Sequence, residues 1–282
     1  MTVIPTSFRA RATGARRSSS AWAIGGPAAL GLGAAVVWLS LLVLIPLAAV
    51  VVTSATGGWP SMQAALTNSQ TLHAVALTVV ESLLVTALNL VMGTTIAWVL
   101  VRDRFVGRRV LDVLIDIPFA LPTIVAGLVL LALYGPDSPI GVDIAQTRVA
   151  VFLALAFVTL PFVVRSVQPV LEQLETDAEE AAASLGASPA TVWRRIILPA
   201  LTPAIAAGGA LSFARAMSEY GAMVLLSGNL PNRTEVASVR VFTYIENGDA
   251  ASAAVVATML LVVSFATLLV IDLIQRRVAR RG

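Results

Sequence analysis

The chain has 282 residues, of which 57% are hydrophobic and only 12% are charged, with a formal net charge of +3. A soluble domain carries about twice that share of charged residues, so much of the apolar surface is expected to face lipid. The sequence therefore predicts an all-α integral membrane protein. Without Lys or Cys, the chain lacks a Walker-type phosphate loop and thiol nucleophiles, and the single histidine His73 cannot supply a histidine metal cluster. The small net charge does not favour a nucleic-acid partner.

Six apolar stretches are long enough to cross about 30 Å of hydrocarbon as helices. A Ser- and Arg-rich segment, residues 1–27, precedes them, and a basic segment, residues 275–282, follows them; both are expected to be tails. The first apolar run exceeds the core of a signal peptide, about 7 to 15 residues, so it is predicted to remain as a span. The membrane domain is thus residues 28–274, with spans at 28–53, 72–100, 110–134, 149–168, 202–226 and 251–274.

The arginines predict the orientation, because cytoplasmic segments retain positive charge. Arg148, Arg233 and Arg240 lie in segments on one side of the predicted spans, and Arg215 falls inside a span. All other arginines lie on the opposite side, together with both tails. The N and C termini are therefore predicted to be cytoplasmic, and the protein is predicted to pass through the membrane several times.

The longest cytoplasmic connection, residues 168–199, predicts two short helices that meet at a corner. Strong helix formers predict a helix over 170–185, and Gly186 ends it in the left-handed conformation that glycine adopts at low cost. Ser188 is a suitable N-cap for the second helix, which Pro199 is expected to stop.

The segment EAAASLGASPATVWRRIILP, residues 180–199, resembles the EAA-x3-G-x9-I-x-LP loop of ABC importer permeases. In that family the loop docks on a separate ATPase subunit and transmits its ATP-driven motion, so the resemblance implies a coupling loop here. The alternative is an amphipathic loop that lies on the membrane or on its own bundle. The matching residues are Glu180, Ala181, Ala182, Gly186, Ile196, Leu198 and Pro199.

The resemblance extends over residues 75–275 and is closest to the T-type permeases of sulfate/thiosulfate importers. It rests on the strings WVLVRDRFVGRRVLDVLIDIPFALPTIVAGLVLLALYG (98–135), LPFVVRSVQPVLEQLE (160–175) and LSFARAMSEYGAMVLLSGNLPNRTE (211–235). Molybdate permeases are similar around FARAMSEYG, so molybdate, tungstate or another oxyanion is an alternative cargo.

The resemblance also implies the assembly and the location. It implies a bacterial cytoplasmic membrane protein with an ABC importer permease fold, working with two copies of an ATPase subunit and an extracytoplasmic sulfate-binding protein. A second permease, either a related W-type subunit or a second copy of this chain, completes the pathway. ATP and Mg²⁺ are expected on the ATPase partner, with no cofactor bound by this chain, which is not expected to be an enzyme.

Ionisable side chains within membrane spans are functional candidates, because each is costly to place in hydrocarbon. Glu81, Arg215 and Glu219 are predicted at similar depths, and Arg215 and Glu219 share a helix face because they are four residues apart. One guanidinium could bridge both carboxylates. We interpret Arg215, Ser218, Glu219 and Glu81 as a gate lining the pathway; the alternative is an ion pair that only fixes helix packing.

Other charges near the membrane have simpler expectations. Asp112 and Asp116 are expected to be compensated by the positive end of their helix and by nearby arginines, and Arg165 is expected to reach the inner interface.

Two further function classes remain open. One is an ATP-independent channel or secondary transporter, and the other is a membrane enzyme that uses Glu81, Glu219 and Asp116 as acid and base groups.

Overall fold

The computed structural model describes residues 26–279, so nearly all of the predicted tail 1–27 and the end of the tail 275–282 lie outside the described residues. The chain divides after Ala48 into two compact units, which are described separately. The first unit is an apolar helix made of α1 (Gly26–Leu39), the π-helical turn η1 (Ser40–Leu44) and the start of α2 (Ile45–Thr56). The continuous stretch Ala29–Thr56 is long and apolar enough to cross a membrane, in the region predicted for the first span.

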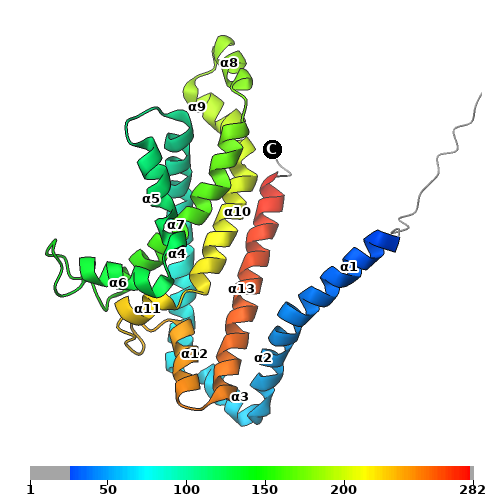
Figure 1. Ribbon diagram of the computed structural model, residues 1–282, viewed down its shortest axis with the longest axis vertical. Helices are drawn as coiled ribbons and strands as arrows, with labels where there is room; N and C mark the ends of the chain where they lie inside the picture. Colours follow the sequence, from blue (N-terminus) through cyan, green and yellow to red (C-terminus); the bar gives the residue numbers. More distant parts are fainter. Residues whose placement is uncertain (1–25, 280–282) are drawn as a thin grey trace, which may run out of the picture. The chain divides into compact units, whose positions relative to one another are not determined.

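The second unit is also helical, and the described part of the chain contains no strand (Figure 1). This confirms the all-α class. Its elements are α3 (Gly58–Thr67), α4 (Ser69–Arg102), α5 (Arg108–Ala120), α6 (Thr123–Tyr134), α7 (Arg148–Gln173), α8 (Asp177–Ser184), α9 (Pro189–Val192), the π-helical turn η2 (Trp193–Ile197), α10 (Leu198–Met217), α11 (Gly221–Leu226), α12 (Ala237–Glu246) and α13 (Ala250–Ala279).

Helices α4, α7 and α10 form the centre of the second unit because small residues let their backbones approach closely. A Cβ atom on Gly93 would lie 2.8 Å from the Cβ of Val163, and one on Gly208 would lie 3.0 Å from the Cα of Val163. The Asn89 side chain also donates a hydrogen bond of 2.9 Å to the Thr159 hydroxyl, which joins α4 to α7. These contacts fix the register of the three helices.

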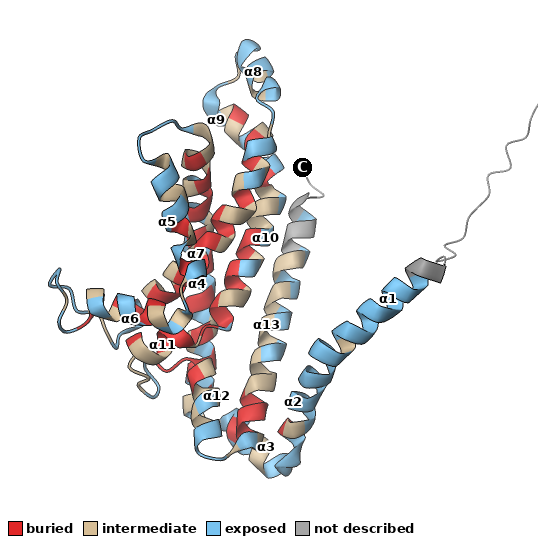
Figure 2. Cartoon of the chain, in the orientation of Figure 1, coloured by how far each residue is buried: buried red, intermediate tan, exposed pale blue. Residues whose placement is uncertain are grey.

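Buried residues concentrate where these three helices meet, whereas the outward faces remain exposed (Figure 2). On α4 the exposed positions Val80, Leu84, Leu88 and Val91 follow helical spacing and are all apolar. An exposed apolar face suits a helix that has lipid as its solvent. This arrangement accounts for the high hydrophobic content of the sequence.

The third predicted span, residues 110–134, is broken into α5 and α6, which are bent by 115°. The break lies at Leu121 and Pro122, and both have extended backbone conformations. A proline disfavours the helical conformation of the residue before it, which explains the end of α5. The described chain therefore has five helices that are long and apolar enough to span, or six when the bent pair is counted as one span.

The prediction that Pro199 stops a helix is wrong, because α9, η2 and α10 form one continuous helix over Pro189–Met217. In η2 the N–H of Leu198 donates to the carbonyl of Trp193, five residues back. This π-helical turn shifts the hydrogen-bond register just before Pro199, which has no N–H to donate, and the helix passes through the proline. The fifth predicted span, 202–226, instead breaks after Met217, at the end of α10.

Candidate functional site

The predicted coupling loop forms a corner at one end of the bundle, where α8 projects beyond the other helices (Figure 1). The single helix predicted over 170–185 is divided, because α7 ends at Gln173 and α8 begins at Asp177. Leu174, between them, has an extended backbone, with a ψ angle of 110°. Acidic residues stabilise a helix start, and Asp177, Glu179 and Glu180 occupy the first turn of α8.

The corner itself has the geometry that the sequence predicts. Gly186 has a φ angle of +83°, its N–H donates to the carbonyl of Ala183, and the N–H of Ala187 donates to the carbonyl of Ala182. This pair of hydrogen bonds is a Schellman motif, which requires a left-handed residue at Gly186. The Ser188 hydroxyl then accepts a hydrogen bond from the N–H of Thr191 and caps α9, as predicted.

Two adjacent glutamates of the corner have different environments. Glu179 accepts a hydrogen bond of 2.5 Å from Arg102, which attaches the corner to the end of α4. Glu180 is exposed, and its carboxylate has no ion pair or hydrogen bond within residues 26–279. The side chain of Leu185, just before Gly186, is 89% exposed. Leu185 was missed by the motif comparison, although an apolar residue beside the glycine of a solvent-facing corner is a signal for a docking contact.

The other residues of the predicted loop lie on both sides of this corner. Ala181 and Gly186 are exposed with Glu180, while Ala182 and Ile196 pack against the apolar cluster at this end of the bundle. Leu198 and Pro199 are exposed at the start of α10. The seven residues therefore combine an exposed surface with an attachment to the core, as a loop that passes on motion would need.

An open groove of about 450 Å³ lies at the corner. It is lined by Trp98 of α4, by Trp193 of η2 and by residues of α8 and α9, including Glu180 and Ala183. The two indole rings meet edge to face, with centroids 4.9 Å apart. The corner is thus held by the Arg102 pair and by the packing of Ala182, with open space between these attachments.

The second predicted site lies at the break between α10 and α11. Arg215 and Glu219 form an ion pair of 2.6 Å, and the Glu219 side chain is completely buried. The other carboxylate oxygen of Glu219 accepts the N–H of Ala222 at 2.8 Å, at the start of α11. Ser218 is exposed, and its hydroxyl donates to the carbonyl of Arg215. Glu219 therefore holds both the guanidinium and the new helix.

The position of helix α11 is set by direct contact between its backbone and α6. A Cβ atom on Gly221 would strike the Thr123 hydroxyl and lie 2.8 Å from the backbone nitrogen of Ile124. A Cβ atom on Gly127 would lie 2.7 Å from the Cα of Ala222. Only glycine fits at these two positions, so the break after α10 is fixed by packing that a hydropathy pattern does not reveal.

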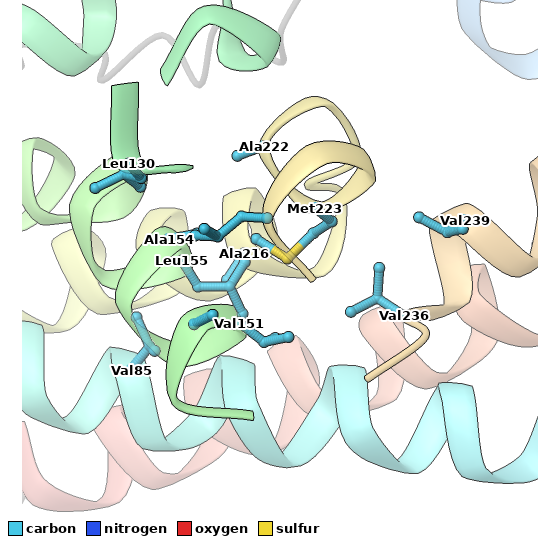
Figure 3. Close-up of a cluster of buried hydrophobic side chains, with 12 residues drawn as sticks. Val85, Leu130, Val151, Ala154, Leu155, Ala216, Ala222, Met223, Val236 and Val239 are labelled. Atoms are coloured by element: carbon cyan, nitrogen blue, oxygen red, sulfur yellow. The ribbon is translucent and has the colours of Figure 1, made fainter. Parts of the chain in front are cut away.

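Glu81 is 7% exposed on α4 and has no ion pair with Arg215. A single guanidinium therefore does not bridge both carboxylates in this structure. Glu81 lies one turn from Val85 and Arg215 adjoins Ala216; Val85 and Ala216 belong to the same buried apolar cluster (Figure 3). The structure thus brings Arg215, Ser218 and Glu219 together, and Glu81 forms no ion pair or hydrogen bond with any of these three residues.

Arg165 has partners that the sequence analysis did not assign to it. Its guanidinium donates to both carboxylate oxygens of Asp116 and to one oxygen of Asp112, each at 2.7 Å. It also donates to the Asp112 carbonyl and to the Gln168 side chain. Arg165 therefore fixes α5 to α7, and it is Arg165, not the helix end or the arginines next in sequence, that pairs with both aspartates.

These partners also bear on the enzyme alternative. Asp116 is occupied by Arg165 and Glu219 by Arg215, while Glu81 joins neither pair. Within the described ranges no group of three His, Cys, Asp or Glu residues is placed to hold a metal ion. Two of the three carboxylates of that hypothesis are therefore held in separate ion pairs with arginines.

Sequence comparison places the chain beside known transport components. Residues 89–281 match the family described as binding-protein-dependent transport system inner membrane component. The sulfate transport system permease protein CysT of Salmonella typhimurium is 39% identical over 259 residues, which cover 89% of this chain and 94% of that protein. The protein of the same name from Synechocystis sp. is 43% identical over 248 residues, covering 86% and 87%.

Structure comparison agrees on the fold. A chain in the crystal structure of a bacterial alginate ABC transporter, bound to a periplasmic protein carrying an alginate pentasaccharide, superposes with a TM-score of 0.74. The match covers 89% of this chain and 94% of that one at 16% identity, so it supports the fold alone. A chain of the methionine transporter MetNI matches with a TM-score of 0.53 and 18% identity, covering 74% and 94%.

Proposed function

Because this chain belongs to the family of binding-protein-dependent transport system inner membrane components, we propose that it is the membrane-spanning permease of an ATP-driven sulfate importer. The chain is a multi-pass membrane protein and not an enzyme, in keeping with the transport components that it matches. The assignment of sulfate is supported by relatives that are named for sulfate transport. Thiosulfate is a second cargo of the same importer, and molybdate, tungstate or another oxyanion is the alternative that an assay must compare.

One observation carries the ATP-driven part of the proposal: the exposed corner at Gly186. It presents Glu180 and Leu185, an unpaired carboxylate and an apolar side chain, next to a backbone turn of fixed geometry. This combination suits docking into a groove with apolar walls and a basic group. The chain has no phosphate loop of its own, so ATP and Mg²⁺ bind the partner ATPase.

The cargo explains why a motor is needed. Moving one charge against a membrane potential of 100 mV costs about 2.3 kcal/mol, so a dianion costs about 4.6 kcal/mol when the cell interior is negative. A thousandfold accumulation adds about 4 kcal/mol. A passive pore would therefore release sulfate from the cell, and ATP hydrolysis on a coupled subunit drives import.

The gate is proposed at the break between α10 and α11. Glu219 holds one end of the Arg215 guanidinium, and the remaining N–H groups form no hydrogen bond with any residue from 26 to 279. Guanidinium groups bind oxyanions through paired hydrogen bonds, and the exposed Ser218 adds a hydroxyl beside them. Glu81, buried on α4, is the fourth residue that we assign to the gate.

The assembly follows from the family. The name of the family includes a binding protein, and the coupling corner supports an ATPase partner. We propose two ATPase copies, an extracytoplasmic sulfate-binding protein and a second permease, which is either a related W-type subunit or another copy of this chain.

The test is an ATPase assay on the complete complex reconstituted in lipid vesicles, with the binding protein loaded with one anion at a time. We expect sulfate to stimulate hydrolysis more than molybdate or tungstate does. A stronger response to molybdate would reassign the cargo while keeping the motor. Hydrolysis that no loaded binding protein changes would contradict the importer itself.

A further inference from the structure

The turn between α4 and α5 carries a surface that the transport mechanism does not use. Residues 103–109 read DRFVGRR and contain the three arginines Arg104, Arg108 and Arg109. Phe105 is 41% exposed, and Val106 is fully exposed. Three guanidinium groups and two apolar side chains therefore share one short surface turn.

The positive charge of this turn is not neutralised by the part of the chain that the structure describes. None of these three guanidinium groups forms an ion pair or a side-chain hydrogen bond with another residue between 26 and 279. The preceding Arg102 differs, because it pairs with Glu179 and lies 5.5 Å from the centre of the Trp98 ring. One acidic residue, Asp103, lies within the turn. The turn therefore keeps an excess of positive charge at the surface.

Helix stability does not explain the position of these arginines. Helix α5 starts at Arg108, so Arg108 and Arg109 occupy its first turn, and this turn has no acidic residue. The N-terminal end of a helix carries partial positive charge and favours acidic side chains. Arginines at this place do not stabilise the helix itself, so their charge remains available to an anion outside the chain.

The surroundings of the turn identify that anion. The apolar side chains Val110, Val113, Leu114 and Ile117 of α5 are exposed and continue from the turn. On its other face α5 is tied to α7 by Arg165, so the apolar face is directed outward, where hydrocarbon would cover it. The turn then lies at the edge of the bilayer, where the phosphate groups of the lipids are found.

We propose that residues 103–109 bind the headgroups of acidic phospholipids in the leaflet on the side of α8, with Phe105 and Val106 entering the interface. Basic residues next to a membrane are attracted to acidic lipids, and exposed apolar side chains add burial in the headgroup layer. An ATPase subunit is a less fitting occupant, because α8 projects farther from the bundle than this turn (Figure 1). This inference does not depend on the identity of the cargo.

The first experiment measures lipid binding to the full chain in detergent by native mass spectrometry, with phosphatidylglycerol as the probe and phosphatidylcholine as the neutral control. The test variant is Arg108→Gln/Arg109→Gln. The matched control is Arg194→Gln/Arg195→Gln, which removes two adjacent exposed arginines at the same end. Each basic residue near an acidic surface contributes roughly fivefold in binding, so we expect about a 30-fold loss in the test variant and less than about a threefold loss in the control.

An equal loss in both variants would show nonspecific charge attraction, and no loss in the test variant would show that the turn does not bind lipid. Either result overturns the proposal. If the double variant does not fold, a second measurement keeps all the arginines, because the chain has no cysteine of its own and a single introduced cysteine can be labelled at one chosen position.

The second experiment places a fluorophore through Val106→Cys or, as a control, Leu185→Cys, two highly exposed apolar positions at the same end of the bundle. In vesicles that contain phosphatidylglycerol, a quencher attached to lipid tails should reduce the emission of the Val106 label at least twofold more than that of the Leu185 label. Equal quenching contradicts insertion of the turn. A Val106 label that responds to the ATPase subunit and not to phosphatidylglycerol would show a protein-docking surface instead.

Discussion

Gly186→Val tests whether the corner between α8 and α9 transmits motion. A Cβ atom on Gly186 would have no atom within 4 Å, so the substitution creates no clash and its cost is conformational. The φ angle of +83° is strained for a β-branched residue, by about 1–2 kcal/mol. This energy reduces the population of the native corner by about 5- to 30-fold relative to other loop conformations.

The chain offers a matched control in Gly141, in the loop between α6 and α7. Gly141 has a φ angle of +71° and also has no atom within 4 Å of an added Cβ, so Gly141→Val imposes similar strain away from the corner. In vesicles that contain the ATPase subunits, the complex with Gly186→Val should hydrolyse ATP without matching sulfate uptake, whereas the complex with Gly141→Val should stay coupled. Normal coupling in Gly186→Val, or equal uncoupling in both variants, would refute the role of the corner.

Three further predictions address the gate, the packing and the start of α13. Arg215→Lys should reduce uptake at least tenfold while the complex stays intact on a sizing column, because an ammonium group cannot form the paired hydrogen bonds of a guanidinium. The control Arg233→Lys, in an exposed loop, should leave uptake normal. Equal uptake rates in the two variants would remove Arg215 from the pathway. Gly221→Ala should lower the free energy of unfolding by about 1–3 kcal/mol, because the added methyl group would clash with the α6 backbone. An unchanged melting temperature in detergent would contradict this packing. Asp249 accepts a hydrogen bond from the N–H of Ser252, and its hydrogen bonds to Ser252 lower the pKa of the carboxyl group. The stabilising effect of Asp249 is therefore present above the unfolded pKa of about 3.9 and is lost as the pH falls through the lower folded pKa. The difference in melting temperature between wild type and Asp249→Ala should consequently shrink in acid. A difference that does not depend on pH would refute this role of Asp249.

The sequence predicted best those features that depend on a few neighbouring residues. The corner at Gly186 and the cap at Ser188 need only a glycine, a hydroxyl and helix formers at fixed spacing, and both are present as predicted. The long apolar runs likewise identified the spanning helices, because lipid exposure requires about 20 apolar residues in sequence.

Features that depend on packing between distant residues were not predictable in this way. Arg165 pairs with aspartates about 50 residues away, and the choice of partner depends on the contact of α5 with α7. The break after Met217 depends on the contact of Gly221 with α6. An average of hydropathy over a long window does not detect a break of three non-helical residues. At Pro199 the π-helical turn overrode a local rule that usually holds.

The most direct test of the central claim is labelled sulfate uptake into vesicles that hold the permease complex, a loaded binding protein outside and ATP inside, measured with and without the ATPase subunit. We expect sulfate to accumulate against a gradient only when the ATPase subunit and ATP are both present. Accumulation by this chain in the absence of the ATPase subunit would show that it is not an ATP-driven permease.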